Sequence, residues 1–325
     1  MNYEEAIARV TAPGQRFEVA TADVGAARMP VFLNSHATLR ELFDSARSHG
    51  DATFLVYEDE RWSFVETMDR VDALAAALVD RFGIEPGDRV AISMRNLPEW
   101  VISFAAVTSV GAVSVSFNAW WVSEEIEYAL DDCAPRLVIA DEQRVERAAG
   151  ACGERAIPLV GVRCGEPRPG VVDFADVLAD AAPMPEVIVE AEMDATILYT
   201  SGTTGHPKGA VSTNRAVLQA LAGFGCRGMA ELVRRAADAP AGDRSGEQRL
   251  RPAFILVVPL FHVTGCVPVM LGSALGGYKL VMMHRWEPER ALELIEREKV
   301  TQLVGVPTQS LSLIHISEPT RRATI

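Results

Sequence analysis

The sequence has few cysteines and no surplus of positive charge. Its five cysteines include no C-x-x-C pair and no neighbouring histidine cluster, which argues against a zinc site or a disulfide framework and favours a reducing cytosol. These residues are Cys133, Cys152, Cys164, Cys226 and Cys266. The formal net charge is -13 at pH 7, so the field of the whole molecule repels nucleic acid and anionic membranes. We therefore expect no nucleic-acid partner.

No basic, apolar leader opens the chain, because acidic residues stand where a secretory signal needs positive charge. One stretch, residues 100–122, lacks charge and is long enough to cross a membrane. It is interrupted by Gly111 and by several polar residues, so we interpret it as a buried helix over 99–110 and a buried strand over 112–117. These features predict no membrane span and a cytoplasmic location.

The chain length of 325 residues and a hydrophobic content of 49% allow about two α/β subdomains. After an irregular start, the pattern predicts a helix from Thr38, a hairpin over 53–62 and a helix capped by Ser63. The next strands are expected at 89–93, 112–117, 136–140 and 157–162, and helices at 98–110, 123–132 and 143–152. Such alternation is typical of a mostly parallel sheet with helices on both faces. Residues 1–162 are therefore predicted to form a first α/β subdomain.

A second alternation follows residues 163–192, a segment rich in proline, alanine and acidic residues that is predicted to be a linker or edge segment. Its expected strands lie at 195–200, 253–259, 279–283 and 302–306, and its expected helices start at Asn214, Thr264 and Pro288. Residues 238–250 are polar and are predicted to form an exposed loop. The fold class is thus α/β with mostly parallel sheets, and residues 193–310 are predicted to be a second, incomplete α/β subdomain.

The most informative segment runs from Ile197 to Gly209, where an apolar strand leads into hydroxyl residues, glycines and one lysine. The residues in question are Thr200, Ser201, Gly202, Thr203, Thr204, Gly205 and Lys208. Glycines let backbone N–H groups converge on an anion, hydroxyl groups donate further hydrogen bonds, and lysine supplies positive charge. The segment matches neither the Walker loop nor the G-x-G-x-x-G fingerprint. It predicts a phosphate-binding loop, and a solvated turn is the plainer alternative.

This loop closely resembles the phosphate-binding signature of the adenylate-forming superfamily, which includes acyl-CoA synthetases, peptide-synthetase adenylation domains and beetle luciferases. Further segments that resemble its motifs lie at 87–100, 111–118, 259–265 and 305–308. Segment 259–265, Pro-Leu-Phe-His-Val-Thr-Gly, has the form typical of acyl-CoA synthetases. The resemblance extends from about Thr38 to Thr308 and implies the N-terminal domain of such an enzyme.

The resemblance implies a reaction in two steps. A carboxylate, above all that of a fatty acid, attacks the α-phosphate of Mg-ATP to give an acyl adenylate and pyrophosphate. A thiol, usually that of CoA, then displaces AMP. ATP, Mg²⁺ and CoA are therefore the implied cofactors and co-substrates, with no metal ligand assigned in this chain. Lys208 would be the catalytic residue, because its charge stabilises the departing pyrophosphate. The loop from Thr200 to Lys208 would bind the phosphates.

His262 follows the apolar stretch 254–261. It is either a hydrogen-bonded histidine at the end of a core strand or, by resemblance, part of the carboxylate end of an acyl pocket. We favour the pocket, because strand ends in such sheets face the ligand crevice. Gly305 is assigned to the same pocket, and His206, in the variable position of the loop, is expected to be solvated. No role is assigned to Trp120, Trp121 and Trp286.

Later motifs of the family are absent, including Tyr-Gly-x-Thr-Glu, Thr-Gly-Asp, the hinge and the C-terminal lysine. Residues 311–321 can be encoded by DNA that resembles a transposase adapter of sequencing libraries, so 311–325 are predicted to be a non-native tail that packs on nothing apolar. We expect an N-terminal fragment, truncated within its second subdomain and inactive by itself. The alternatives are an adenylation domain that loads a carrier protein and a non-catalytic nucleotide-binding fragment.

Overall fold

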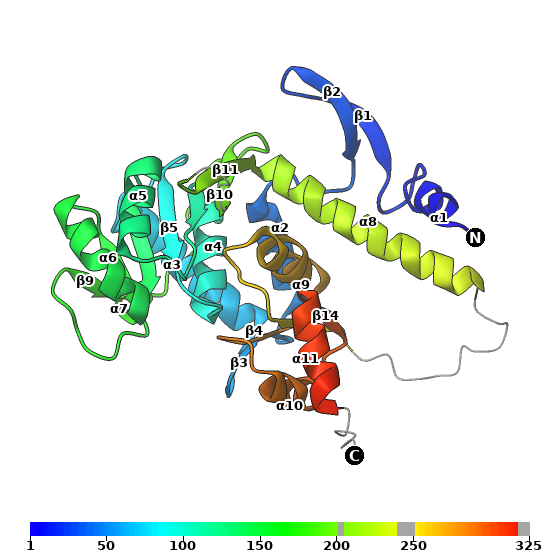
Figure 1. Cartoon of the computed structure of the whole chain (residues 1–325). Helices are drawn as coiled ribbons and strands as arrows, with labels where there is room; N and C mark the ends of the chain where they lie inside the picture. Colours follow the sequence, from blue (N-terminus) through cyan, green and yellow to red (C-terminus); the bar gives the residue numbers. More distant parts are fainter. Residues whose placement is uncertain (201–204, 239–250, 318–325) are drawn as a thin grey trace, which may run out of the picture.

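The computed structural model describes residues 1–200, 205–238 and 251–317, and seven of the strands in these ranges form the larger sheet (Figure 1). Its strand order is β11-β10-β6-β5-β7-β8-β9. The strands are β5 (Arg89–Ser93), β6 (Val113–Ser116), β7 (Leu137–Asp141), β8 (Leu159–Val162), β9 (Val171–Asp173), β10 (Asp194–Thr200) and β11 (Lys208–Thr213). Only the β10–β11 pair is antiparallel among these strands. The expected mostly parallel sheet is confirmed.

Alternate residues of the larger sheet point to two different cores, as the pleat of a strand requires. Val90 and Ile92 belong to the core shared with the smaller sheet, whereas Ala91 belongs to a second core on the opposite face. The helices that contribute side chains to the shared core are α2 (Leu39–Ala46), α3 (Phe64–Asp80), α4 (Pro98–Ser109), α7 (Phe174–Val177), α8 (Asn214–Asp238), the π-helix η2 (Gly265–Leu271) and α9 (Gly272–Gly276). The short helix η1 (Arg47–His49) follows α2. The opposite face is covered by α5 (Ser123–Cys133) and α6 (Glu142–Glu154).

The helix α4 explains the long uncharged stretch in the sequence. Every residue of α4 is buried, because the helix packs in the shared core against strands of both sheets, including β3 and β5. A helix in such a position is apolar on all sides. Among the described residues, no helix has both the length and the apolar character needed to cross a membrane.

The smaller sheet has the order β14-β12-β13-β3-β4. Its strands are β3 (Thr53–Tyr57), β4 (Glu60–Ser63), β12 (Ala253–Leu256), β13 (Lys279–Met282) and β14 (Gln302–Val304), and α10 (Pro288–Glu298) lies between the last two in the chain. The expected boundary between 1–162 and 193–310 does not separate the two sheets. β3 pairs with β13, and β10 pairs with β6. A sequence pattern identifies a strand, whereas tertiary packing decides which strand becomes its neighbour.

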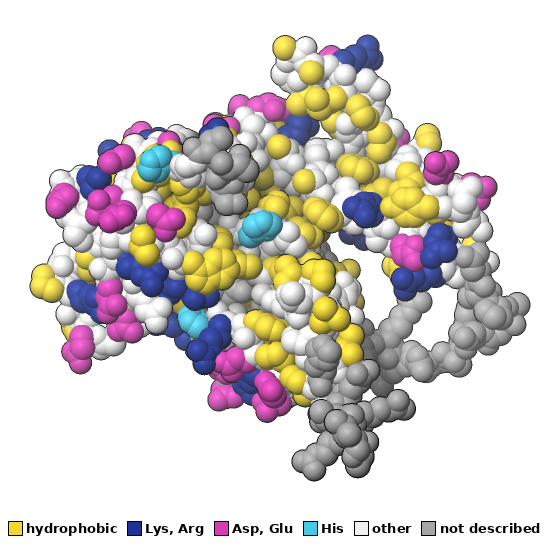
Figure 2. All heavy atoms as spheres, viewed as in Figure 1, with side chains coloured by type: hydrophobic (Ala, Val, Ile, Leu, Met, Phe, Trp, Pro, Cys, Tyr) yellow, Lys and Arg dark blue, Asp and Glu magenta, His cyan; other side chains and the backbone are white. Residues whose placement is uncertain are grey.

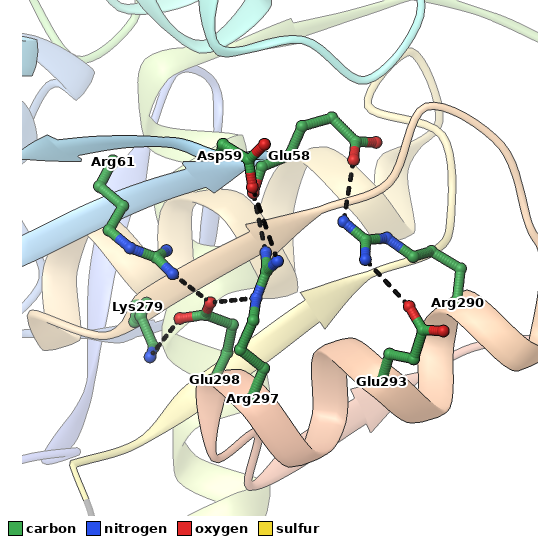
Figure 3. Close-up of polar contacts among 8 residues, drawn as sticks. All are labelled: Glu58, Asp59, Arg61, Lys279, Arg290, Glu293, Arg297 and Glu298. Carbon is green, nitrogen blue, oxygen red and sulfur yellow. Dashed lines mark hydrogen bonds and ion pairs between the residues drawn. The ribbon is translucent and has the colours of Figure 1, made fainter.

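Ion pairs fasten the β3–β4 hairpin to α10 and β13 (Figure 3). Glu298, the last residue of α10, is only 5% exposed and accepts hydrogen bonds from three cationic side chains. These are Arg61 at 2.6 Å, Lys279 at 3.0 Å and Arg297 at 3.0 Å. At the turn of the hairpin, Glu58 pairs with Arg290 at 3.0 Å. The hairpin is thus attached to the smaller sheet by side chains from distant parts of the sequence.

The expectation of an irregular start is wrong, because the first 32 residues form α1 (Tyr3–Val10), β1 (Val19–Val24) and β2 (Ala27–Phe32). Asn2 and Glu5 make a reciprocal capping box at the start of α1, with distances of 2.8 and 3.0 Å. The long helix α8 (Asn214–Asp238) packs against α1, and the side chain of Gln219 bonds both backbone groups of Phe32. Hydrophobic side chains gather over the β1–β2 hairpin and α8 (Figure 2). They line a largely apolar cavity of about 660 Å³.

The last described element is α11 (Pro307–Ser317). Leu313 packs against the core of the smaller sheet that contains Ile255 and Val281. Ser312 Oγ accepts a hydrogen bond from Trp286 Nε1 at 3.1 Å. The expectation that residues from 311 onward pack on nothing apolar is therefore wrong for 311–317, because helix α11 turns an apolar side chain toward that core. Residues 318–325 of the predicted tail, and residues 239–250 of the predicted loop, lie outside the described ranges.

Candidate active site

The β10–β11 hairpin carries the predicted phosphate loop at its tip. In the antiparallel register Thr200 lies opposite Lys208, and Thr200 Oγ1 donates a hydrogen bond to the Lys208 carbonyl oxygen at 3.3 Å. The sequence predicts a helix from Asn214 after the loop, and α8 does start there, but β11 intervenes unpredicted. Four residues of the predicted loop lie outside the described ranges, namely Ser201, Gly202, Thr203 and Thr204.

Both glycines at the far end of the loop are required by the backbone. Gly205 has a φ of 124°, a conformation that side chains disfavour. A Cβ on Gly209 would lie 2.7 Å from Ile197 Cγ2, so glycine permits the close pairing of the two strands. Lys208 is exposed, and no carboxylate in the described part of the chain forms an ion pair with it. Its charge is therefore available to an anion at the hairpin tip.

The carboxyl ends of strands from both sheets meet beside this hairpin. Asn96, which follows β5 and is 7% exposed, joins the two sheets through its side-chain amide. Its Nδ2 donates to the Val258 carbonyl oxygen at 3.1 Å, and its Oδ1 accepts from Leu260 N at 2.9 Å. Crevices at the carboxyl ends of strands are the usual ligand sites of open α/β sheets. The buried amide thus holds the floor of a candidate crevice.

A buried ion pair fixes two further loops at the same edge. Asp141 accepts hydrogen bonds from Arg95 N at 2.9 Å and from Arg144 Nη1 at 3.1 Å. Arg144 is 2% exposed and donates through Nε to the Ala119 carbonyl oxygen at 2.7 Å. The pair therefore holds the backbone that follows β5 and the backbone that follows β6. Both charged side chains are themselves buried.

The predicted pocket residue His262 is exposed, so it is not a core histidine. It lies after β12 in the turn that leads to η2, and its Nδ1 accepts from Thr264 N at 3.3 Å. Its neighbour Phe261 meets Trp120 edge-on, with ring centroids 5.0 Å apart. Since Trp120 follows β6, this contact brings the loops after β6 and β12 together. Trp120 is 53% exposed and lies at the rim.

Gly305, the other predicted pocket residue, follows β14 directly. The side chain of Gln309 occupies the space beside it, because a Cβ on Gly305 would lie 2.6 Å from Gln309 Oε1. Gln309 in turn bonds Val306 N at 3.0 Å and the Val257 carbonyl oxygen at 3.1 Å. The structure thus places Gly305 at the end of the strand next to β12, and it records no direct contact between Gly305 and His262 in the described residues.

A basic cluster at this edge was not identified in the sequence. The Arg95 guanidinium lies 5.2 Å from the Trp120 ring centroid, and His284 lies after β13 on a polar cleft of about 350 Å³. Arg95 Nε and His284 Nδ1 are buried and have no hydrogen-bond partner among the described residues. Burial, followed by nearby arginines, lowers the pKa of both groups. Their position in the sequence could have indicated them, because Arg95 and His284 each follow a buried strand of a parallel sheet.

Comparison with known families identifies the class of protein. The model of the family described as "AMP-binding enzyme" matches residues 42–324. The chain belongs to this family. The resemblance to adenylate-forming enzymes drawn from the loop motif is thereby confirmed. The match covers the β10–β11 hairpin and the strand ends described above, so the candidate site lies within the matched region.

Relatives of this AMP-binding enzyme include 4-coumarate–CoA ligase 2 of Oryza sativa subsp. japonica, 28% identical over 86% of this chain and 49% of the relative. 4-Coumarate–CoA ligase 3 of Arabidopsis thaliana is 29% identical over 72% and 39%, respectively. The chain thus spans about half or less of these two relatives.

Solved structures confirm the fold. The N-terminal domain of FACL13 from Mycobacterium tuberculosis superposes with a TM-score of 0.67 at 24% identity, covering 86% of this chain and 66% of that one. ATP-bound MatB from Rhodopseudomonas palustris gives a TM-score of 0.66 at 23% identity, covering 87% and 51%. At such identities the likeness establishes architecture rather than substrate.

The described residues of this AMP-binding enzyme offer no group of three or more His, Cys, Asp or Glu side chains that could hold a metal ion. At the hairpin, the described residues offer an exposed lysine beside two glycines that the backbone requires, and groups of these kinds can bind phosphate.

Proposed function

We propose that this chain carries the phosphate-binding part of an ATP-dependent acid–thiol ligase. The complete enzyme would convert a carboxylic acid into an acyl adenylate and pyrophosphate, and then transfer the acyl group to the thiol of CoA with release of AMP. The observation that carries this proposal is the hairpin tip, where exposed Lys208 lies opposite Thr200 without a carboxylate partner in the described residues. Membership of the AMP-binding family supports the same assignment.

In the first step, a carboxylate oxygen attacks the α-phosphorus of ATP, and the bond to the oxygen bridging to the β-phosphate breaks. Negative charge builds on the departing pyrophosphate, so catalysis needs positive charge and N–H donors rather than a protein nucleophile. Lys208 would supply the charge, and Thr200 and Gly205 would bind the phosphates together with the four loop residues outside the described ranges. Mg²⁺ would arrive with ATP, and we assign it no ligand in this chain.

The carboxylic acid would bind where the loops after β12 and β14 approach each other, with His262 and Gly305 lining the carboxylate end. The exposure of His262 supports a place on the crevice wall, and its Nδ1 is oriented by Thr264 N. We propose a fatty acid as the substrate. The names of the curated 4-coumarate–CoA ligases make an aryl acid the competing class, and a parallel assay with both acids would decide between them.

The basic cluster supports CoA as the thiol substrate. CoA carries phosphate groups and an adenine ring, and Arg95 with exposed Trp120 offers both a cation and an aromatic face. His284, whose buried Nδ1 has no hydrogen-bond partner among the described residues, lines the adjacent cleft. All five cysteines are free thiols, which supports a reducing compartment and hence the proposed cytoplasmic location.

The proposal is tested by titrating the chain with magnesium pyrophosphate and comparing Lys208→Ala with Lys208→Arg. Loss of a charge-assisted contact should weaken binding about 10- to 100-fold in Lys208→Ala, and Lys208→Arg should retain most of the affinity. Arg168→Ala is the matched control, because Arg168 lies next to β9, at the opposite edge of the sheet from β11. If Lys208→Ala and Arg168→Ala bind equally well, Lys208 is not the phosphate ligand.

We further propose that the 325-residue chain alone gives no ATP–pyrophosphate exchange that depends on a carboxylic acid. The family resemblance assigns part of the Mg-ATP site to motifs that this sequence does not contain, among them Tyr-Gly-x-Thr-Glu and Thr-Gly-Asp. Robust exchange with a fatty or aryl acid would contradict this inactivity while supporting the adenylation chemistry itself. Exchange that persists in Lys208→Ala would contradict the role of the lysine.

A further inference from the structure

The start of the phosphate loop is attached to α5 through Tyr199. Its hydroxyl donates a hydrogen bond to Asp132 Oδ2 at 2.7 Å. Its ring lies edge-on to Phe117 and Trp121, with centroid separations of 6.0 and 5.2 Å. Burial, followed by the hydrogen bond to Asp132, raises the pKa of the Tyr199 phenol, so the phenol remains a donor at physiological pH. Tyr199 immediately precedes Thr200, where the predicted loop begins.

The end of the same loop is attached to α5 through His206. Its ring stacks on that of Tyr128, with centroids 4.4 Å apart and planes inclined by only 14°. His206 was expected to be solvated, and it is exposed, but this contact gives it a defined place. Only Pro207 separates it from Lys208. The position of the stacked ring therefore affects the direction from which the chain reaches the lysine.

The two attachment points lie on one face of one helix. Tyr128 and Asp132 are four residues apart on α5, so their side chains are neighbours on the helix surface. The opposite face of α5 is held in the core of the larger sheet by Ile126, Ala129, Leu130 and Cys133. The helix is therefore a fixed support for Tyr199 and His206, the two loop-end residues that contact it.

We propose that Tyr128 and Asp132 are positioning residues, which hold the two ends of the phosphate loop on α5 and thereby raise its affinity for a polyphosphate. Neither residue needs to touch the ligand. They act by restricting the loop before binding, because ordering backbone at the moment of binding costs conformational entropy. The proposal rests on the proposed function, in which this loop binds the phosphates of ATP.

The experiment compares Tyr128→Leu, Tyr199→Phe and the double variant with the unaltered chain. Tyr128→Phe preserves the stack and is the conservative control, and Glu127→Gln changes an exposed charge elsewhere on α5. Two quantities are measured: the dissociation constant for magnesium pyrophosphate, and amide hydrogen exchange of the peptide covering 199–213 without ligand. We expect each disruptive variant to weaken binding and to accelerate exchange in this peptide by about three- to tenfold. Exchange in α6 should stay unchanged, which a general loss of stability would not allow.

Two outcomes separate the positioning role from the proposed function. If the unaltered chain binds pyrophosphate through Lys208, and the disruptive variants leave both binding and exchange unchanged, the positioning role is overturned and the function stands. If the chain binds no pyrophosphate, but the variants accelerate exchange only in 199–213, α5 does hold the loop and the phosphate function fails. Faster exchange in Tyr128→Phe equal to that in Tyr128→Leu would also overturn the stacking contact.

Discussion

Two polar networks hold this molecule together, one in each sheet, and they hold different kinds of atoms. In the larger sheet, Asp141 and Arg144 bond each other and also two backbone groups, Arg95 N after β5 and the Ala119 carbonyl after β6. In the smaller sheet, the described partners of the Glu298 carboxylate are all side chains, those of Arg61, Lys279 and Arg297 (Figure 3). Both networks contain a buried carboxylate.

The two networks therefore have different roles. The Asp141 network shapes the loops of the candidate site, and the Glu298 network attaches the β3–β4 hairpin to α10 and β13. A carboxylate that accepts from backbone N–H fixes the path of a loop to a fraction of an ångström, as the crevice at the strand ends requires. A carboxylate that gathers arginine and lysine side chains joins two elements, and long side chains can adjust to small shifts. Damage to the Asp141 network should therefore affect both stability and the site, whereas damage to the Glu298 network should affect stability alone.

The largest effect is expected from Asp141→Ala. The change leaves the Arg144 guanidinium buried without its counter-ion and removes the acceptor for Arg95 N. Breaking a buried pair in this way typically costs about 3–5 kcal/mol of unfolding free energy. Urea unfolding followed by circular dichroism measures it. The double variant Asp141→Leu with Arg144→Met should recover part of the loss, because no charge is then left buried.

Full recovery in the double variant would show that the pair shapes no loop. The backbone of Arg95 and the carbonyl of Ala119 would still lack their partners, so the double variant should remain less stable than the unaltered chain. If Asp141→Ala lowered the unfolding free energy by less than about 1 kcal/mol, the contrast between the two networks would disappear, because an ordinary exposed ion pair contributes that much.

The sequence predicted elements better than it predicted neighbours. The hydroxyl and glycine pattern placed the phosphate loop after a strand at 195–200, and β10 ends at Thr200. The sequence pattern missed β11, because this strand is short and only partly buried. It lacks the apolar alternation that marks a core strand. The same pattern also gave no sign that β3 joins the smaller sheet, since the pairing of Leu55 with Leu280 joins residues far apart in the chain.

The candidate site was predicted in the same uneven way. Lys208 and Thr200 were predicted because they belong to one contiguous motif, and the structure places them opposite each other. Asp141 and Arg144 were missed, because an aspartate at a helix start with an arginine three residues later is an ordinary capping pattern. Only their burial, 6% and 2% exposed, distinguishes them from surface residues. Burial depends on what packs above a residue, and periodicity does not report this.

An intermediate effect is expected from Glu298→Gln. Although burial alone would raise the pKa of Glu298, hydrogen bonds from Arg61 and Lys279 outweigh it and lower the pKa. The folded state therefore favours the carboxylate, and the stabilisation is complete above the pKa of the unfolded chain, about 4.3. It is lost as the pH falls through the lower folded-state pKa. At pH 7 the loss in Glu298→Gln should be about 1–3 kcal/mol.

The pH series supplies the check on this mechanism. Urea unfolding of Glu298→Gln and of the unaltered chain should differ most at pH 7, and the difference should shrink below about pH 4. Glu296→Gln, an exposed neighbour on α10, is the matched control and should leave the unfolding free energy nearly unchanged. A difference that grows as the pH falls would contradict a lowered pKa. Altered pyrophosphate binding in Glu298→Gln would contradict the inference that the Glu298 network affects stability alone.

The smallest effect is expected from the exposed part of the same network, at the turn of the hairpin. Glu58 and Arg290 pair at 3.0 Å, but their side chains are 56% and 30% exposed. Water screens the attraction, and holding two long side chains in one geometry costs entropy, so such pairs contribute about 0.2–1 kcal/mol. A double-mutant cycle with Glu58→Gln and Arg290→Gln isolates this coupling energy.

Salt then distinguishes the exposed pair from the buried carboxylate of the same element. At about 1 M salt the screening length is about 3 Å, so the Glu58–Arg290 coupling should fall to near zero. The loss caused by Glu298→Gln should persist, because a side chain with 5% exposure is screened far less. If both effects vanish together in salt, Glu298 behaves as a surface charge, and the hairpin is held by apolar packing of β3 against β13. If neither responds, the Glu58–Arg290 coupling that remains at about 1 M salt does not arise from screened charge.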